Sequence, residues 1–209
     1  MIDWSWILEN WLPIGLLLAD HVQLVTLGLC SGMLVAGLMV LLTLWKPALA
    51  RPMIYLSGIL FTIPSLALFI LIMPFTGLSK TTSVIGLSLY ALLIILQNTL
   101  AGLASNPAHI LEEARALGYT RIQCFLGVEL PLALPALLAG LRTTSVTLVG
   151  LVTVTALIGQ GGLGQLFITG LAQSFTTPVV VSLILTVLLA FCFDYLFYSI
   201  DKFLIRWVR

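Results

Sequence analysis

Residues 82–104 read TSVIGLSLYALLIILQNTLAGLA and contain no charged side chain. A helix rises about 1.5 Å per residue, so this stretch is long enough to cross the roughly 30 Å hydrocarbon core of a bilayer. In lipid, each backbone polar group needs a partner within the protein, which helices supply along their own length. The stretch therefore predicts a membrane-spanning helix.

The same pattern recurs along the chain. Of the 209 residues, 60% are hydrophobic and only 8% are charged, and the mean hydropathy is +1.17. A soluble core could not hide this much apolar surface. We therefore predict an all-α, polytopic membrane protein in which residues 1–209 form a single transmembrane domain. The four further spans are expected at about 22–45, 53–74, 132–158 and 178–200.

The N-terminal segment differs from these spans. Trp4, Trp6 and Trp11 lie among acidic residues and a proline. Tryptophan is enriched at the headgroup level of membranes, so we expect an interfacial helix here. Residues 1–20 contain no Lys or Arg, so the basic start of a cleavable signal peptide is missing and the segment is expected to be retained.

The basic residues predict the orientation in the membrane. Three connecting or terminal segments carry almost all of them, whereas Lys80 stands alone on the opposite side. Cytoplasmic loops carry an excess of Lys and Arg, so we expect an outer N-terminus and a cytosolic C-terminus. A net charge of only +1 gives no reason to expect nucleic acid as a partner. The clustered residues are Lys46 with Arg51, Arg115 with Arg121, and Lys202 with Arg206 and Arg209.

One hydrophilic segment, residues 105–130, lies between the third and fourth spans. We expect an amphipathic cytosolic helix there, with Asn106 as its cap, Pro107 at its first position and a break or tightening at Gly118. The alternative is a helix that merely rests on the inner membrane surface with solvated charges. The charged residues of the segment are Glu112, Glu113, Arg115, Arg121 and Glu129.

The spacing within this segment is specific. It reads Glu112-Glu113-Ala114, three residues, Gly118, nine residues, Val128, one residue, and Leu130-Pro131. This resembles the EAA loop of bacterial ABC importer permeases, with Glu113 in place of the first alanine and Val128 in place of isoleucine. The resemblance implies a coupling helix that fits a groove on a separate cytosolic ATPase. Physically, an acid at Glu112 can make charge-assisted contacts, and Gly118 lets the backbone bend.

Further stretches are similar to permeases for betaine, choline or carnitine. They are 61–68 (FTIPSLAL), 90–93 (YALL), Asn98-Thr99, 139–143 (AGLRT) and 158–164 (IGQGGLG). The sequence departs from that group at Ile94 and Gln97, where a proline and an arginine are expected. The resemblance implies import of a quaternary-amine osmoprotectant, with an amino acid as the alternative solute. It also implies a bacterial inner-membrane location, a second permease copy or paralogue, and an extracytoplasmic binding protein.

Several side chains within the spans are candidates for a solute path. Aromatic faces bind cations, which makes Tyr55, Phe61 and Tyr90 candidates, and the amide of Asn98 adds a polar one. Each could equally serve in ordinary helix packing. Arg142 and Asp194 could form an intramembrane ion pair, or Arg142 could extend to the inner interface.

The sequence gives no sign of catalysis. It lacks a Gly-x4-Gly-Lys-Ser/Thr phosphate loop, so ATP and Mg²⁺ are expected to be used by a partner, and no metal or cofactor is expected on this chain. The Gly-x-Gly-x-x-Gly pattern of residues 159–164 follows a long membrane helix, which argues against dinucleotide binding. An ion-coupled transporter or channel is the rival class, but it would need more buried charges and often an internal repeat. A membrane scaffold would not need the spaced loop.

Overall fold

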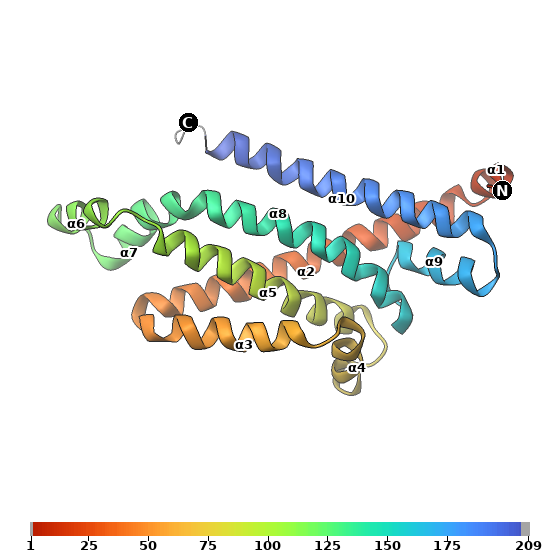
Figure 1. The fold of residues 1–209 in the computed structure, drawn as a ribbon, viewed down its shortest axis with the longest axis horizontal. Helices are drawn as coiled ribbons and strands as arrows, with labels where there is room; N and C mark the ends of the chain where they lie inside the picture. Colours follow the sequence, from red (N-terminus) through yellow and green to blue (C-terminus); the bar gives the residue numbers. More distant parts are fainter. Residues whose placement is uncertain (1, 206–209) are drawn as a thin grey trace.

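The computed structural model describes residues 2–205, and this part of the chain contains helices and no strand. The long helices run side by side along one axis, with shorter helices at both ends (Figure 1). The α-helices are α1 Trp4–Glu9, α2 Trp11–Trp45, α3 Ala50–Thr62, α4 Ser65–Thr76, α5 Lys80–Ala104, α6 Ala108–Ala116, α7 Arg121–Cys124, α8 Leu130–Thr155, α9 Leu163–Ala172 and α10 Thr176–Leu204. The shorter turns are η1 Pro47–Leu49, η2 Phe125–Glu129 and η3 Ala156–Ile158.

Helix α5 lies at the centre and packs against both α2 and α8. Small residues allow the close approach. A Cβ atom on Gly32 of α2 would lie 2.5 Å from the Cβ of Ala91, and one on Gly140 of α8 would lie 2.7 Å from the Cβ of Asn98. In lipid, helix association depends on such tight packing, since the surrounding hydrocarbon is as apolar as the side chains. Three fully buried leucines and valines mark this seam, namely Leu87, Leu96 and Val149.

The second predicted span is not one straight helix. Helices α3 and α4 meet at a bend of 99°. Ile63 and Pro64 have extended ψ angles of 128° and 135°, and the proline has no N–H to donate to the preceding turn. The hydroxyl of Tyr90 donates to the carbonyl of Ile63, which replaces a helical partner lost at the bend. Within residues 2–205, four helices are therefore long and apolar enough to cross a membrane, or five when the bent pair is one span.

The first span begins earlier than predicted. Helix α2 has 35 residues and starts at Trp11, so a separate N-terminal helix exists only at Trp4–Glu9. Asp3 caps that helix, and the Ser5 hydroxyl and the Trp6 N–H lower the pKa of its carboxyl. The charge of Asp20 argued against a membrane span before residue 22. In the structure, the Asp20 carboxylate accepts a 2.7 Å hydrogen bond from the ammonium of Lys80 on the side of the bundle.

The glycine-rich turn connects α8 to a helix that was not predicted, α9. Gly159, Gly161 and Gly162 all have positive φ angles, which glycine adopts without steric cost. The turn folds α9 back against α2, α8 and α10, and the Ser182 hydroxyl of α10 donates to the carbonyl of Leu163 at 2.7 Å. A helix of ten mostly apolar residues is too short to cross a bilayer, so α9 covers the end of the bundle.

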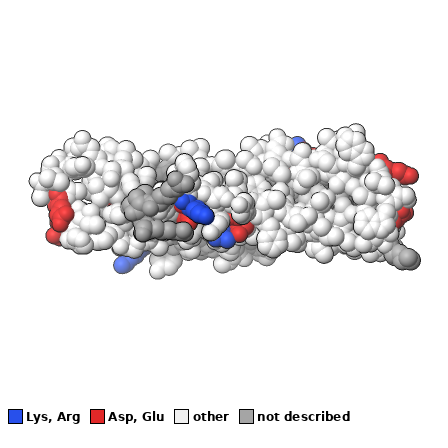
Figure 2. Space-filling model, turned by 90° about the horizontal axis from the view of Figure 1, so that it is seen from above, with Lys and Arg blue, Asp and Glu red and all other residues white. Residues whose placement is uncertain are grey.

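Helix α10 is the least covered of the long helices, with only 6% of its most apolar window buried inside the chain. Charged side chains on the face it helps to form are gathered near the two ends of the molecule and at one place between them (Figure 2). Lys202 ends α10. Arg206 and Arg209, which the orientation argument also used, lie outside the described residues.

Candidate coupling segment and solute path

The predicted hydrophilic segment forms α6, α7 and η2 and lies at one end of the bundle (Figure 1). The prediction of Asn106 as the cap is wrong. Pro107 is the N-cap residue of α6, with an extended ψ of 126°. The side-chain amide of Asn106 instead donates to the backbone carbonyl of Glu129 at 2.9 Å. Asn106 therefore ties the start of the segment to its end.

Helix α6 stops at Gly118, where the sequence predicts a break. Gly118 has φ +84°, its N–H donates to Arg115, and the N–H of Tyr119 donates to Ala114. These two bonds form a Schellman motif, which satisfies carbonyls at the end of a helix. A Cβ on Gly118 would meet no atom within 4 Å, so backbone conformation rather than space favours glycine here.

The acidic residues of α6 point to solvent. Glu112 and Glu113 are exposed, whereas Ala114, the third residue of the motif, is buried. The remainder of the tip presents apolar side chains to solvent, led by Leu117 at 78% exposure. Apolar and acidic groups together on a rigid tip are suited to contact with another protein that has a basic rim. The other exposed apolar residues of this tip are Tyr119, Ile122 and Leu126.

Glu129 anchors the segment to α8. Its side chain is only 8% exposed, and it accepts from the guanidinium of Arg121 and, weakly, from the thiol of Cys124 at 3.7 Å. It lies in the five-residue π-helical turn η2, and such turns often occur at functional sites. Sequence reasoning counted Glu129 among the solvated charges and missed this role. Arg121 lies eight residues before Glu129 in the sequence. This spacing indicates an ion pair only when α7 and η2 are known to fold together.

The last residues of the motif lie at the same joint. Val128 is half-buried in η2, Leu130 opens α8, and Pro131 occupies its first turn, where a missing N–H costs nothing. The motif residues are therefore divided between an exposed acidic tip and a partly buried joint. Through this joint, α7 continues into α8 without an intervening loop.

The predicted path residues are not brought together. The rings of Phe61 and Tyr90 make an edge-to-face contact at 5.4 Å between centroids, next to the α3–α4 bend. Tyr55 lies on α3 and is 71% exposed. Asn98 packs against Gly140, and its amide donates to the carbonyl of Ile94 at 2.8 Å. Of the four predicted path residues, Phe61 and Tyr90 are thus the pair that the fold brings into contact.

Arg142 and Asp194 are brought together by the packing of α8 against α10. The guanidinium binds the carboxylate through two nitrogens, with one bond at 2.6 Å and a second, shorter one from Nε. The guanidinium carbon also lies 5.7 Å from the ring centroid of Tyr198. Such bidentate pairing is the strongest geometry available to an arginine and a carboxylate.

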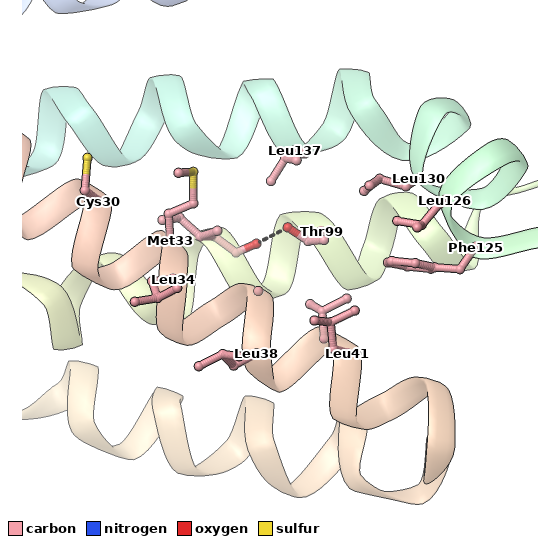
Figure 3. A pocket seen from close by; sticks show the side chains of 13 residues that line it. Cys30, Met33, Leu34, Leu38, Leu41, Thr99, Phe125, Leu126, Leu130 and Leu137 are labelled. Carbon is pink, nitrogen blue, oxygen red and sulfur yellow. Dashed lines mark hydrogen bonds between the residues drawn. The ribbon is translucent and has the colours of Figure 1, made fainter. Parts of the chain in front are cut away.

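A cavity of about 630 Å³ lies between α2, α5 and the joint at η2 (Figure 3). Its walls are nearly all hydrocarbon, supplied by residues such as Leu38, Phe125 and Leu126. The hydroxyl of Thr99 is used on the carbonyl of Ile95 at 2.7 Å. The cavity therefore offers apolar surface and no charge. Among the described residues, no three His, Cys, Asp or Glu side chains are grouped as metal ligands.

Comparison with known proteins gives a family match over most of the chain. Residues 25–206 match the model described as binding-protein-dependent transport system inner membrane component. The osmoprotectant import permease protein OsmW of Salmonella typhimurium is 32% identical over 201 residues, which cover 94% of each chain. The choline transport system permease protein OpuBB of Bacillus subtilis is 33% identical, over 84% of this chain and 81% of its own length.

Solved structures share the fold. A chain of the MetNI methionine ABC transporter in an inward-facing conformation superposes with a TM-score of 0.81. The match covers 92% of this chain and 98% of that chain at 24% sequence identity. The overall helical arrangement of this chain is therefore one already known from a solved structure.

Proposed function

Because the chain belongs to the family of binding-protein-dependent transport system inner membrane components, we propose that it is the permease subunit of an ATP-driven importer. In this proposal the helices form part of the pathway through the membrane, with the N-terminus outside and the C-terminus in the cytosol. A second copy or a paralogue completes the pathway, and an extracytoplasmic binding protein delivers the solute. ATP and Mg²⁺ are used by a separate cytosolic ATPase, while this chain binds no cofactor.

The observation that carries the proposal is the acidic tip of α6 and its rigid joint to α8. Glu112 and Glu113 are exposed at the end of the bundle, and Gly118, Arg121 and Glu129 fix the tip to the membrane helices. A stand-alone channel has no need of such a projection. When a partner ATPase closes, a tip held this way transmits a rigid-body movement to α8.

The solute we propose is a quaternary-amine osmoprotectant such as choline, glycine betaine or carnitine. The names of the relatives OsmW and OpuBB support an osmoprotectant or choline for those proteins, and both are similar to this chain along most of its length. The sequence stretches that resemble betaine and choline permeases support the same class. Specificity in this scheme lies mainly in the soluble binding protein.

The test is uptake by the whole complex, reconstituted in liposomes with its ATPase and binding protein. We expect ATP-dependent accumulation of labelled choline, glycine betaine or carnitine, and little accumulation of methionine or histidine. Accumulation of amino acids alone would show that the transported solute is an amino acid and not a quaternary amine. Accumulation that proceeds without ATP would contradict the importer itself.

Coupling is tested by reversing charge at the tip. We expect Glu112→Lys to reduce capture of the ATPase subunit and ATP-driven uptake about tenfold, since a charge-assisted contact becomes a repulsion. The control is Glu9→Lys, which makes the same charge reversal at an exposed position near the opposite end of the molecule. Equal capture by the two variants would show that the tip does not bind the ATPase.

A further inference from the structure

Besides the apolar cavity near the coupling segment, a second cavity lies between α8 and α10 and has a different character. Its volume is about 650 Å³, which is within the range of small-molecule sites. Arg142, Asp194, Tyr198 and Asp201 line it together with two threonines. One guanidinium and two carboxylates leave this lining with a net charge of minus one.

The charged side chains of this cavity lie far from the ends of their helices. Arg142 lies halfway along the 26-residue helix α8, and Asp194 lies ten residues before the end of α10. Their side chains are still 45% and 34% exposed in the single chain. Ionisable groups at this depth are costly against lipid and are typical of substrate or ion pathways. The face that carries them therefore borders a polar space or another subunit rather than hydrocarbon.

The groups around Arg142 are those that bind an organic cation. The guanidinium rests on the face of Tyr198, with 5.7 Å to the ring centroid, while the Asp194 carboxylate holds it from the side. An aromatic face and a carboxylate are the recognition elements for quaternary ammonium groups. Thr143 and Thr147 use their hydroxyl protons on backbone carbonyls at 3.1 and 2.9 Å, so their oxygens present lone pairs to the cavity.

We propose that this cavity is a transit site for the quaternary ammonium of the solute, in which Arg142 is a tethered cation that the solute displaces. The proposal rests on the proposed function and names a site for it. The trimethylammonium group takes the place of the guanidinium between Tyr198 and Asp194. The displaced Arg142 is then available to the carboxylate of a zwitterion such as glycine betaine, whereas choline has no group for it.

The two charges therefore act differently on the two solutes. Asp194→Asn leaves the positive charge of Arg142 unpaired, which repels the cation choline more than the net-neutral glycine betaine. Arg142→Gln leaves the carboxylates in excess, which favours choline and removes the partner of the betaine carboxylate. A pair that only holds α8 to α10 would affect both solutes in the same proportion.

The experiment measures initial rates of ATP-driven uptake of choline and glycine betaine by the reconstituted complex at saturating binding protein. We expect the choline-to-betaine rate ratio to fall about threefold or more in Asp194→Asn and to rise by a similar factor in Arg142→Gln. Tyr198→Leu should lower both rates about tenfold, and Tyr198→Phe should lose less, because the ring face remains. Phe191→Leu is the control, since Phe191 is an exposed aromatic residue on the same helix that does not line the cavity.

The results separate failure of the site from failure of the function. A wild-type complex that takes up neither solute overturns the proposed function and this site with it. A wild-type complex that transports both, with an unchanged ratio in both charge variants and equal losses in Tyr198→Leu and Phe191→Leu, overturns the site alone. If loss of a charge prevents assembly, Arg142→Lys, which keeps the charge, and the Tyr198 variants are measured instead. An unchanged uptake rate in Tyr198→Leu then contradicts the proposal.

Discussion

Gly162 occupies a position where no side chain fits. It has φ +48°, and a Cβ atom there would lie 2.6 Å from the backbone nitrogen of His21 and 2.6 Å from the carbonyl oxygen of Leu17. These are atoms of the backbone of α2, so they cannot rotate away. His21 itself is buried and its Nε2 lies 3.0 Å from the carbonyl oxygen of Val149. Gly162 therefore fixes the turn before α9 onto α2 and, through His21, onto α8.

We expect Gly162→Ala to destabilise the protein by about 3 kcal/mol, which combines overpacking with the cost of positive φ. The measurement is the thermal unfolding midpoint of the purified chain in detergent at a fixed heating rate. Gly159→Ala is the control. Gly159 also has positive φ, at +76°, but a Cβ there meets no atom within 4 Å, so about 1 kcal/mol is expected. Equal shifts would show that space at Gly162 is not limiting.

At this scale the sequence indicates special residues but not their contacts. The run of glycines at 159–164 predicts a turn, and Gly118 predicts a break, because both follow from backbone freedom. That Gly162 rests on His21 could not be predicted, since the two positions are far apart in the chain. The burial of Glu129 was missed for the same reason. A charged residue in a hydrophilic segment is expected to be solvated, and only the fold places Arg121 beside Glu129.

Among the elements, the bend between α3 and α4 depends on a side chain from α5. The hydroxyl of Tyr90 donates to the carbonyl of Ile63, and its ring contacts Phe61. Within a membrane, a carbonyl released by a helix break has no water to replace its lost partner. Tyr90 thus holds the bend in place whether or not the solute passes nearby.

We expect Tyr90→Phe to lower stability by about 1–3 kcal/mol, because it leaves the carbonyl of Ile63 without a donor while keeping the aromatic contact. The readout is again the unfolding midpoint in detergent. Tyr55→Phe removes the same hydroxyl from a side chain that is 71% exposed, and it should change little. A loss in Tyr55→Phe as large as that in Tyr90→Phe would contradict the role of the bond.

The candidate coupling segment, residues 105–130, has its own stabilising ion pair. We expect Arg121→Leu to loosen α6 and α7, because the nearly buried carboxylate of Glu129 loses its charged partner. Chymotrypsin should then cut at Leu117 or Tyr119 severalfold faster. Arg115→Leu is the matched control, since Arg115 is exposed and forms no ion pair within residues 2–205. Unchanged cleavage in Arg121→Leu would show that the pair does not order the segment.

The length of the apolar runs identified most of the helices, but it gave a wrong start for α2 and did not identify α9. The runs at 82–104 and 178–200 lie within α5 and α10. The start of α2 was placed too late because Asp20 and His21 interrupt the apolar run, yet both are satisfied by partners on other helices. Helix α9 was missed because its ten residues are too few for the membrane-spanning length by which the other helices were identified.

For the whole molecule, the orientation in the membrane is a prediction from the few basic residues. In a cysteine-free background, we expect Lys80→Cys to react with an impermeant maleimide on intact cells, whereas Glu113→Cys should react only after permeabilisation. Lys80 begins α5 and Glu113 lies on α6, just beyond the other end of α5, so the two labels report on the two ends of that helix. The reverse labelling pattern would place the coupling segment outside and exclude contact with a cytosolic ATPase.

Two apolar clusters hold the described helices together. The large cluster runs along α2, α5 and α8, while a small one, formed by Ile14, Leu163 and Leu166, joins the start of α2 to α9. The large cluster competes with lipid tails, which are as apolar as its own residues. The small one has three buried side chains and holds a short helix. A change that weakens apolar packing should therefore release α9 before it separates the long helices.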